Sequence, residues 1–94
     1  MDLEIFKASL QGEAAPEGAS KAVAALWQAA NGKWDLAHEM AQSQDDKAGA
    51  WVHAYLHRVE GDLKNAGYWY RRAERPEVTM PLEQEWDEIA ATLL

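Results

Sequence analysis

The 94-residue chain has no cysteine, few prolines and no long apolar run. Without cysteine, neither a disulfide framework nor a thiolate metal site is possible, and this composition fits a reducing cytoplasm. No apolar stretch approaches the roughly 20 residues of a membrane helix. Residues 1–7 carry acids where a secretory signal would begin with basic residues. We therefore expect a cytoplasmic protein without a membrane partner.

Basic residues are also scarce. Nine lysines and arginines stand against sixteen acidic residues, which gives a formal net charge of −7. Nucleic acid phosphates and anionic lipids repel such a chain, so we expect no nucleic acid partner. Hydrophobic residues make up 48% of the sequence, which argues against disorder. A chain of this length should form one domain with its own core.

Apolar residues recur at helical spacing along the chain, and no segment alternates as a strand would. The pattern predicts an all-α fold in one domain, residues 1–94. We expect a short helix and a linker in residues 1–19, two helical hairpins in residues 20–76 and a last helix in residues 79–94. The helices expected within the hairpins cover residues 21–30, 34–42, 47–59 and a segment that follows Asp62 and ends before Pro76.

Polar residues mark the expected helix starts, and periodic apolar residues mark the buried faces. Asp2, Ser20, Asp62 and one of Asp45 and Asp46 are predicted N-caps. The glycines and the proline of the linker suggest that the N-terminal helix docks loosely. Residues expected on buried faces include Phe6, Leu36, Ala37, Val52, Tyr55, Leu56, Val59, Leu63, Ala66, Tyr70, Leu82, Trp86 and Ile89, with Trp51 at the edge of its stripe.

A helix, turn and helix pattern occurs twice, 29 residues apart. In each copy a glycine is followed by a large apolar residue two positions on and by an alanine five positions on, namely Gly32, Trp34 and Ala37, then Gly61, Leu63 and Ala66. Glycine permits a tight turn, the apolar residue covers the top of the helix pair, and the small alanine lets two helices approach closely. The repeat therefore predicts two similar helical hairpins.

The second copy resembles the second half of a tetratricopeptide-type repeat, through Gly61, Asp62, Leu63 and Ala66, followed by Trp69, Tyr70 and Ala73. The match covers residues 47–76 and, more weakly, residues 20–44. The resemblance implies two tetratricopeptide-like hairpins, closed by N- and C-terminal capping helices. The run from His53 to Ala73 is also similar to a run in small bacterial proteins without an assigned activity, and this second resemblance implies no function.

Histidines give the sequence its candidate metal site. His53 and His57 lie four residues apart, so one helical face can present both to a divalent metal ion, with Glu60 as a third ligand. His38 on the neighbouring helix would come close if the hairpins pack as expected. The pattern lacks the acid of a His-Glu-x-x-His signature. The alternative is structural: the histidines lie between helices, and Glu60 pairs with a basic neighbour.

A basic face is predicted on the helix that follows Asp62, formed by Lys64, Tyr68, Arg71, Arg72 and Arg75. In an acidic protein such a face could bind a carboxylate, a phosphate or an acidic peptide segment. The alternative is that acids of the last helix neutralise it, and that helix is expected to expose Glu83, Glu85, Asp87 and Glu88.

Five tryptophans, at positions 27, 34, 51, 69 and 86, lie at or beside apolar stripes, which favours a role in the core. Trp34 is the exception, because it follows the turn and could be partly exposed to a partner.

The function predicted from these features is a small protein-interaction scaffold without a cofactor. Its helical groove would bind a partner peptide or acidic segment through His53, His57, Arg58, Tyr68, Arg71, Arg72 and Trp34. The alternative is a metal- or ligand-binding protein, including a small enzyme, that uses His38, His53, His57 and Glu60. No serine lies in a glycine elbow and no glycine loop could hold phosphate, so an enzyme has less support. The chain is expected to be a monomer or a weak homodimer.

Overall fold

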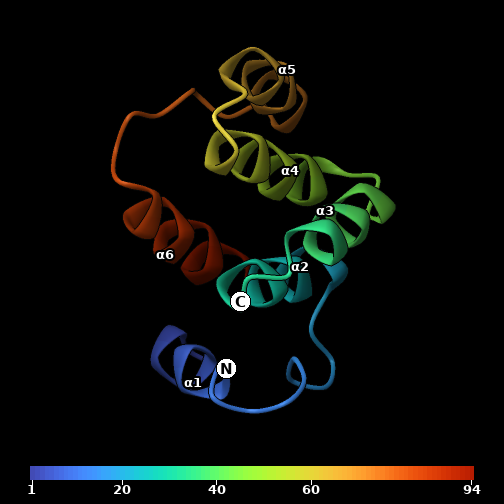
Figure 1. Ribbon diagram of the computed structural model, residues 1–94, viewed down its shortest axis with the longest axis vertical. Coiled ribbons are helices and arrows are strands. Elements are labelled where there is room, and N and C mark those ends of the chain that lie inside the picture. Colours follow the sequence, from blue (N-terminus) through green and yellow to red (C-terminus); the bar gives the residue numbers. More distant parts are fainter.

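The computed structural model describes residues 1–94, and it is all-helical, as predicted (Figure 1). Its helices are α1 (Leu3–Ser9), α2 (Lys21–Ala30), α3 (Trp34–Ser43), α4 (Lys47–Val59), α5 (Leu63–Ala73) and α6 (Leu82–Leu93). No helix is both long and apolar enough to cross a membrane.

The helix starts follow from capping side chains that the sequence predicted. Asp2, Ser20, Asp46 and Asp62 each accept a hydrogen bond from a backbone N–H three residues on, at the starts of α1, α2, α4 and α5. Such a side chain satisfies one of the unpaired N–H groups in the first helical turn. These four boundaries are therefore set by local chemistry.

The two repeated segments form helical hairpins. Helix α2 packs along α3, and α4 packs along α5, while α3 packs on α4 and so joins the two hairpins. Gly32 and Gly61 lie in the turns with φ of +77° and +83°, a left-handed conformation that side chains disfavour. The prediction of two helix–turn–helix units is consistent with this order of contacts.

Helix α6 does not continue the stack beyond α5. It returns across the chain and packs on α4 and α2, and it meets α5 through a hydrogen bond between the Tyr70 hydroxyl and Glu85 (Figure 1). Trp86 anchors it, because its indole Nε1 donates to the Leu26 carbonyl over 2.9 Å. The face of α2 and α4 that a partner helix could otherwise occupy is therefore filled by the chain's own last helix.

Helix α1 is firmly docked, so the prediction of loose docking is wrong. The Phe6 side chain is fully buried and its ring stacks on Trp86 at a centroid distance of 5.6 Å. The Trp27 indole Nε1 also donates to Ser9 Oγ at 3.2 Å. The linker allowed the helix to reach α6, where buried Phe6 holds it together with Leu3 and Leu10, which pack against the core.

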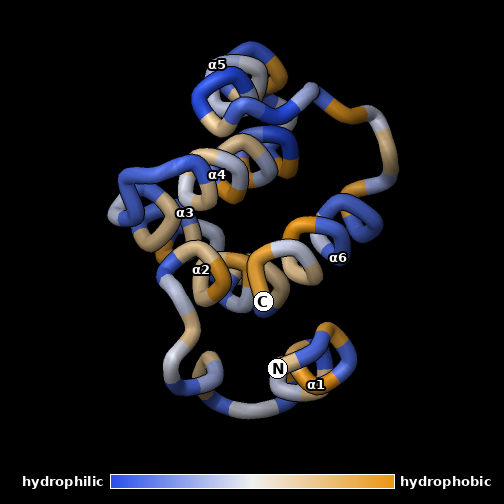
Figure 2. The backbone as a smooth tube through the Cα atoms, turned by 180° about the vertical axis from the view of Figure 1, so that it is seen from behind, coloured by the Kyte–Doolittle hydropathy of each residue, from blue (hydrophilic) through white to orange (hydrophobic).

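The core lies where α2, α4 and α6 meet, and its largest fully buried side chains are Trp27, Tyr70, Phe6, Leu26, Leu56, Ile89 and Val52. Figure 2 shows α5, which packs mainly on α4, as mostly hydrophilic. Trp51, expected at the edge of its stripe, is buried.

Four predicted core positions are exposed instead: Leu36, Val59, Leu63 and Leu82. All four lie in the first or last turn of a helix. Apolar residues recur at helical spacing up to the ends of each helix, whereas the neighbouring helix covers only the middle turns. Glu85, expected on the outer face of α6, is buried.

Candidate histidine groove

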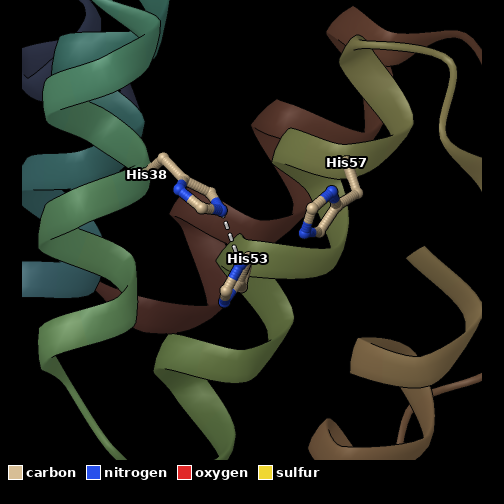
Figure 3. Close-up of side chains that lie close together, drawn as sticks. All are labelled: His38, His53 and His57. Atoms are coloured by element: carbon tan, nitrogen blue, oxygen red, sulfur yellow. Dashed lines mark hydrogen bonds between the residues drawn. The ribbon is translucent and has the colours of Figure 1, made fainter. Parts of the chain in front are cut away.

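A shallow groove runs over α4 between α3 and α5. Both helices pack on α4, but they do not contact each other, so a strip of α4 lies between them. His53 and His57 lie one turn apart on this strip, and His38 reaches it from α3 (Figure 3). On the α5 side the groove is bordered by Trp69 and Arg72. We call this region the histidine groove.

The three histidine rings form a compact cluster. The Nε2 atoms of His38 and His53 are 2.7 Å apart. The His57 ring stacks on His53 at a centroid distance of 4.9 Å and lies 5.4 Å from the His38 ring. One ring nitrogen of each histidine lies within 4.8 Å of one in the others, close enough for the three to hold a single metal ion. Figure 3 shows a ring nitrogen of His57 directed toward the other two rings.

His53 is the centre of the cluster and is only 3% exposed. Its ring stacks on Trp69 at a centroid distance of 3.9 Å. Burial, followed by the nearby His38, His57 and Arg72, lowers the pKa of His53 to about 4. Burial and His57 also lower the pKa of His38. Both rings are therefore neutral at pH 7 and each has a nitrogen lone pair.

The hydrogen bonding of this cluster is incomplete. Neutral imidazole has one N–H, so in the 2.7 Å contact one Nε2 donates and the other accepts. His53 Nδ1 is buried and has no hydrogen-bond partner. A buried polar atom without a partner reduces stability by about 1–3 kcal/mol. The histidines are thus held together by packing, and their polar groups are not all satisfied.

His57 is better supported. Its Nδ1 lies 2.6 Å from Glu60 Oε1 and 3.8 Å from Asp62 Oδ2. A proton on Nδ1 that is donated to Glu60 leaves the Nε2 lone pair free. Asp62 also caps α5, and hydrogen bonds from Asn65 lower the pKa of its carboxyl group. The carboxylates at the α4–α5 turn therefore fix one tautomer of His57.

The other predicted site residues lie in different places. Trp34 is half-buried, stacks on His38 at 4.9 Å and donates from Nε1 to the Leu56 carbonyl, so it supports the cluster. Tyr68 and Arg72 meet at the α5 edge of the groove, where Arg72 donates to the Tyr68 hydroxyl over 3.4 Å. Arg71 is exposed and forms no ion pair.

Arg58 lies on the side of α4 that faces α6. Its guanidinium donates to Glu85 Oε1 at 2.9 Å and to the Met80 carbonyl, and its side chain is 12% exposed. Arg58 is therefore engaged within the chain. No ion pair joins α5 to α6, so the acids of the last helix do not neutralise the basic face.

Two contributors were not singled out from the sequence. Trp69 forms one wall of the groove, although it was placed with the core tryptophans. Glu85 is buried between α4 and α5, although it was placed on the acidic outer face of α6. Its spacing to Ile89, one turn further on, is the sequence signal that could have placed it inward.

Comparison with known proteins adds no relative: no family model, no curated protein and no solved structure matches the chain.

Proposed function

We propose that this protein binds a divalent transition metal ion, zinc or a metal of similar ligand preference, through His38, His53 and His57. The observation behind the proposal is that three imidazoles from two neighbouring helices bring one ring nitrogen each to within 4.8 Å of the others, and that burial keeps two of them, His38 and His53, neutral. Imidazole nitrogen is a preferred ligand of Zn²⁺, Cu²⁺ and Ni²⁺. Three protein ligands would leave a further coordination position for water or another small ligand.

For His38 and His53 only a small movement is needed for coordination, whereas the His57 ring, which is stacked on His53 with an interplanar angle of 15°, would have to turn its Nε2 toward the ion. Two nitrogens on a tetrahedral zinc ion are about 3.3 Å apart, because each Zn–N bond is about 2.0–2.1 Å. The Nε2 atoms of His38 and His53 lie 2.7 Å apart, so their rings would separate slightly. The ion would take the place of the Nε2 proton between them, and that proton would move to Nδ1 of the same ring. It would also connect α3 to α4, and so the first hairpin to the second.

In this proposal Glu60 orients the metal-binding His57 and does not itself bind the metal. Its carboxylate accepts from His57 Nδ1, which is the usual arrangement around a metal-bound histidine. His53 has no such partner, since its Nδ1 is buried without a hydrogen bond. We therefore expect His57 to be the best oriented of the three ligands.

A zinc titration of chelator-stripped, untagged protein tests the proposal. Calorimetry should give one ion per chain. Zinc at a hundredfold excess over Kd adds about 2.7 kcal/mol to the folded state. In a domain of this size that is a rise in Tm of about 10 °C or more. Both responses should disappear in His38→Gln and His57→Gln, whereas Lys64→Gln, an exposed change on α5, should keep them. Absence of binding heat and an unchanged Tm in the wild-type chain would overturn the proposal.

The predicted interaction scaffold remains a second proposal, supported by the exposed Tyr68, Arg71 and Arg72 on α5. These side chains could bind an acidic segment. The sequential packing of α2 on α3, α3 on α4 and α4 on α5 supports a tetratricopeptide-like pair of hairpins. Charge reversal at Arg71 and Arg72 should then abolish salt-sensitive binding of an acidic peptide. Binding that survives the reversal would remove this role.

A further inference from the structure

The histidine groove continues past His53 into a cavity of about 210 Å³. Its floor is the first half of α4, one wall is the end of α3 with the α3–α4 loop, and the other wall is α5. The loop lies this close because residue 49 is glycine: a Cβ there would be 1.9 Å from the Gln44 carbonyl oxygen. The lining residues include Gln42, Asp45, Asp46, Lys47, His53, Trp69 and Arg72.

Two of the four charged groups that line the cavity have close partners. Asp46 caps α4 through the Gly49 N–H and also accepts from the Gln44 side chain. Lys47 Nζ pairs with Glu74 at 2.6 Å. Asp46 is thus used by the fold, whereas Lys47 directs its exposed ammonium to Glu74.

Arg72 and Asp45 have no such close partner. The guanidinium carbon of Arg72 lies 5.1 Å from the Trp69 ring centroid, and one of its nitrogens makes a long, 3.4 Å contact with the Tyr68 hydroxyl. Its one carboxylate neighbour is Asp45, at 3.8 Å, and the Asp45 side chain is 94% exposed. A bidentate arginine–carboxylate pair has shorter hydrogen bonds of about 2.7–2.9 Å. Arg72, whose side chain is 48% exposed, thus lies beside two aromatic rings and has no carboxylate at bidentate distance.

We propose that this cavity binds a small carboxylate ligand, with the carboxylate on Arg72 and the non-polar part against Trp69. Asp45 shows that a carboxylate can approach this guanidinium from the loop side. The volume equals that of about seven waters at roughly 30 Å³ each, which suits a short carboxylic acid. This binding site does not depend on a metal at the histidines.

The net charge of −7 does not exclude an anion at this point. Fields from distant surface charges decay over about 8 Å at physiological ionic strength. The ligand would replace the loose contact with Asp45, so the neutral variant Asp45→Asn should bind it more tightly. This expected gain of affinity separates a ligand site from a merely structural arginine.

The test is a titration of metal-free protein with propionate at constant ionic strength, followed by NMR of the Trp69 indole and Arg72 guanidinium signals. We expect saturable shifts at both residues. Arg72→Gln should weaken binding by about tenfold or more, since hydrogen bonds to charged groups contribute that much. Asp45→Asn should strengthen it severalfold. Arg75→Gln is the matched control, because Arg75 lies over Trp51, outside this cavity.

Propionamide, which has the same shape without the charge, should not bind. Equal shifts with propionamide, non-saturable shifts, or unchanged affinity in Arg72→Gln would each overturn the carboxylate site. Because no metal is present, these outcomes are independent of the zinc titration, and a failure of zinc binding would leave this result unaffected.

Discussion

Helix α4 presents a buried polar cluster on each of two sides, and the two clusters differ in how well they are satisfied. Toward α6, Arg58 donates to Glu85 and to a backbone carbonyl, and the Tyr70 hydroxyl donates to the second oxygen of Glu85. Toward α3, His53 and His38 share one proton and His53 Nδ1 has no partner. We call the first the arginine cluster.

The difference indicates different roles. In the arginine cluster both carboxylate oxygens have donors and opposite charges are paired, so little bonding capacity is left for another molecule. In the histidine cluster burial keeps His38 and His53 neutral, and His53 Nδ1 has no hydrogen-bond partner. Fully satisfied buried networks hold a fold together, whereas unsatisfied ones call for another explanation, such as an absent ion. We therefore assign stability to the first cluster and metal binding to the second.

The largest expected effect follows from breaking the arginine cluster. Glu85→Ala leaves the Arg58 charge and the Tyr70 hydroxyl buried without their acceptor, so it should destabilise the protein by about 3–5 kcal/mol. Urea denaturation of the metal-free protein measures this loss. Replacing both charges, as Arg58→Met with Glu85→Leu, should recover much of it. His57→Ala, at the edge of the other cluster, should lower metal-free stability by less than Glu85→Ala, and a larger loss there would reverse the assignment.

A smaller effect is expected from acid on the histidine cluster. The unfolded chain protonates His53 near pH 6.5, whereas the folded chain does so only near pH 4. The stabilisation that neutral His53 provides above pH 6.5 is therefore lost as the pH falls toward 4. At pH 5 the free energy of unfolding should be lower by about 2 kcal/mol. Denaturation of metal-free protein at pH 8 and pH 5 gives the difference. The His53→Phe variant keeps a ring on Trp69, and its difference in stability between pH 8 and pH 5 should be smaller. An unchanged difference would show that His53 does not cause it.

The smallest effect comes from one hydroxyl of the arginine cluster. Tyr70→Phe removes a hydrogen bond to Glu85 and should reduce stability by about 1–2 kcal/mol. Tyr55→Phe is the matched control, because Tyr55 is also buried but its hydroxyl makes no hydrogen bond. Burial raises the pKa of Tyr55 to about 12, and burial together with Glu85 raises the pKa of Tyr70. Equal losses in the two variants would show that the Glu85 bond adds nothing.

The features predictable from sequence were local ones. Capping by Ser20 or Asp62 depends on residues three positions away, and the shared face of His53 and His57 depends only on helix geometry. The approach of His38 followed from the repeat, which predicted neighbouring hairpins. In each of these cases the spacing of the residues in the sequence determines how they lie in space.

The features that escaped prediction depend on packing between distant segments. Glu85 is buried because Arg58 and Tyr70, on α4 and α5, meet it there. Leu63 continues an apolar stripe but lies beyond the end of the covering helix and is 64% exposed. The return of α6 onto α2 depends on Trp86 reaching the Leu26 carbonyl, 60 positions earlier. Periodicity gives the face of a helix, but not the partner that covers it.

The central claim is that the histidine cluster is a metal site and the arginine cluster is not, and one NMR titration tests it directly. The chain has only three histidines, so their ring signals can be followed individually during addition of Zn²⁺. We predict that the rings of His38, His53 and His57 shift together and saturate at one equivalent, while the signals of Arg58 and Tyr70 stay in place. Unchanged histidine rings, or zinc shifts confined to the acidic face of α6, would contradict the claim.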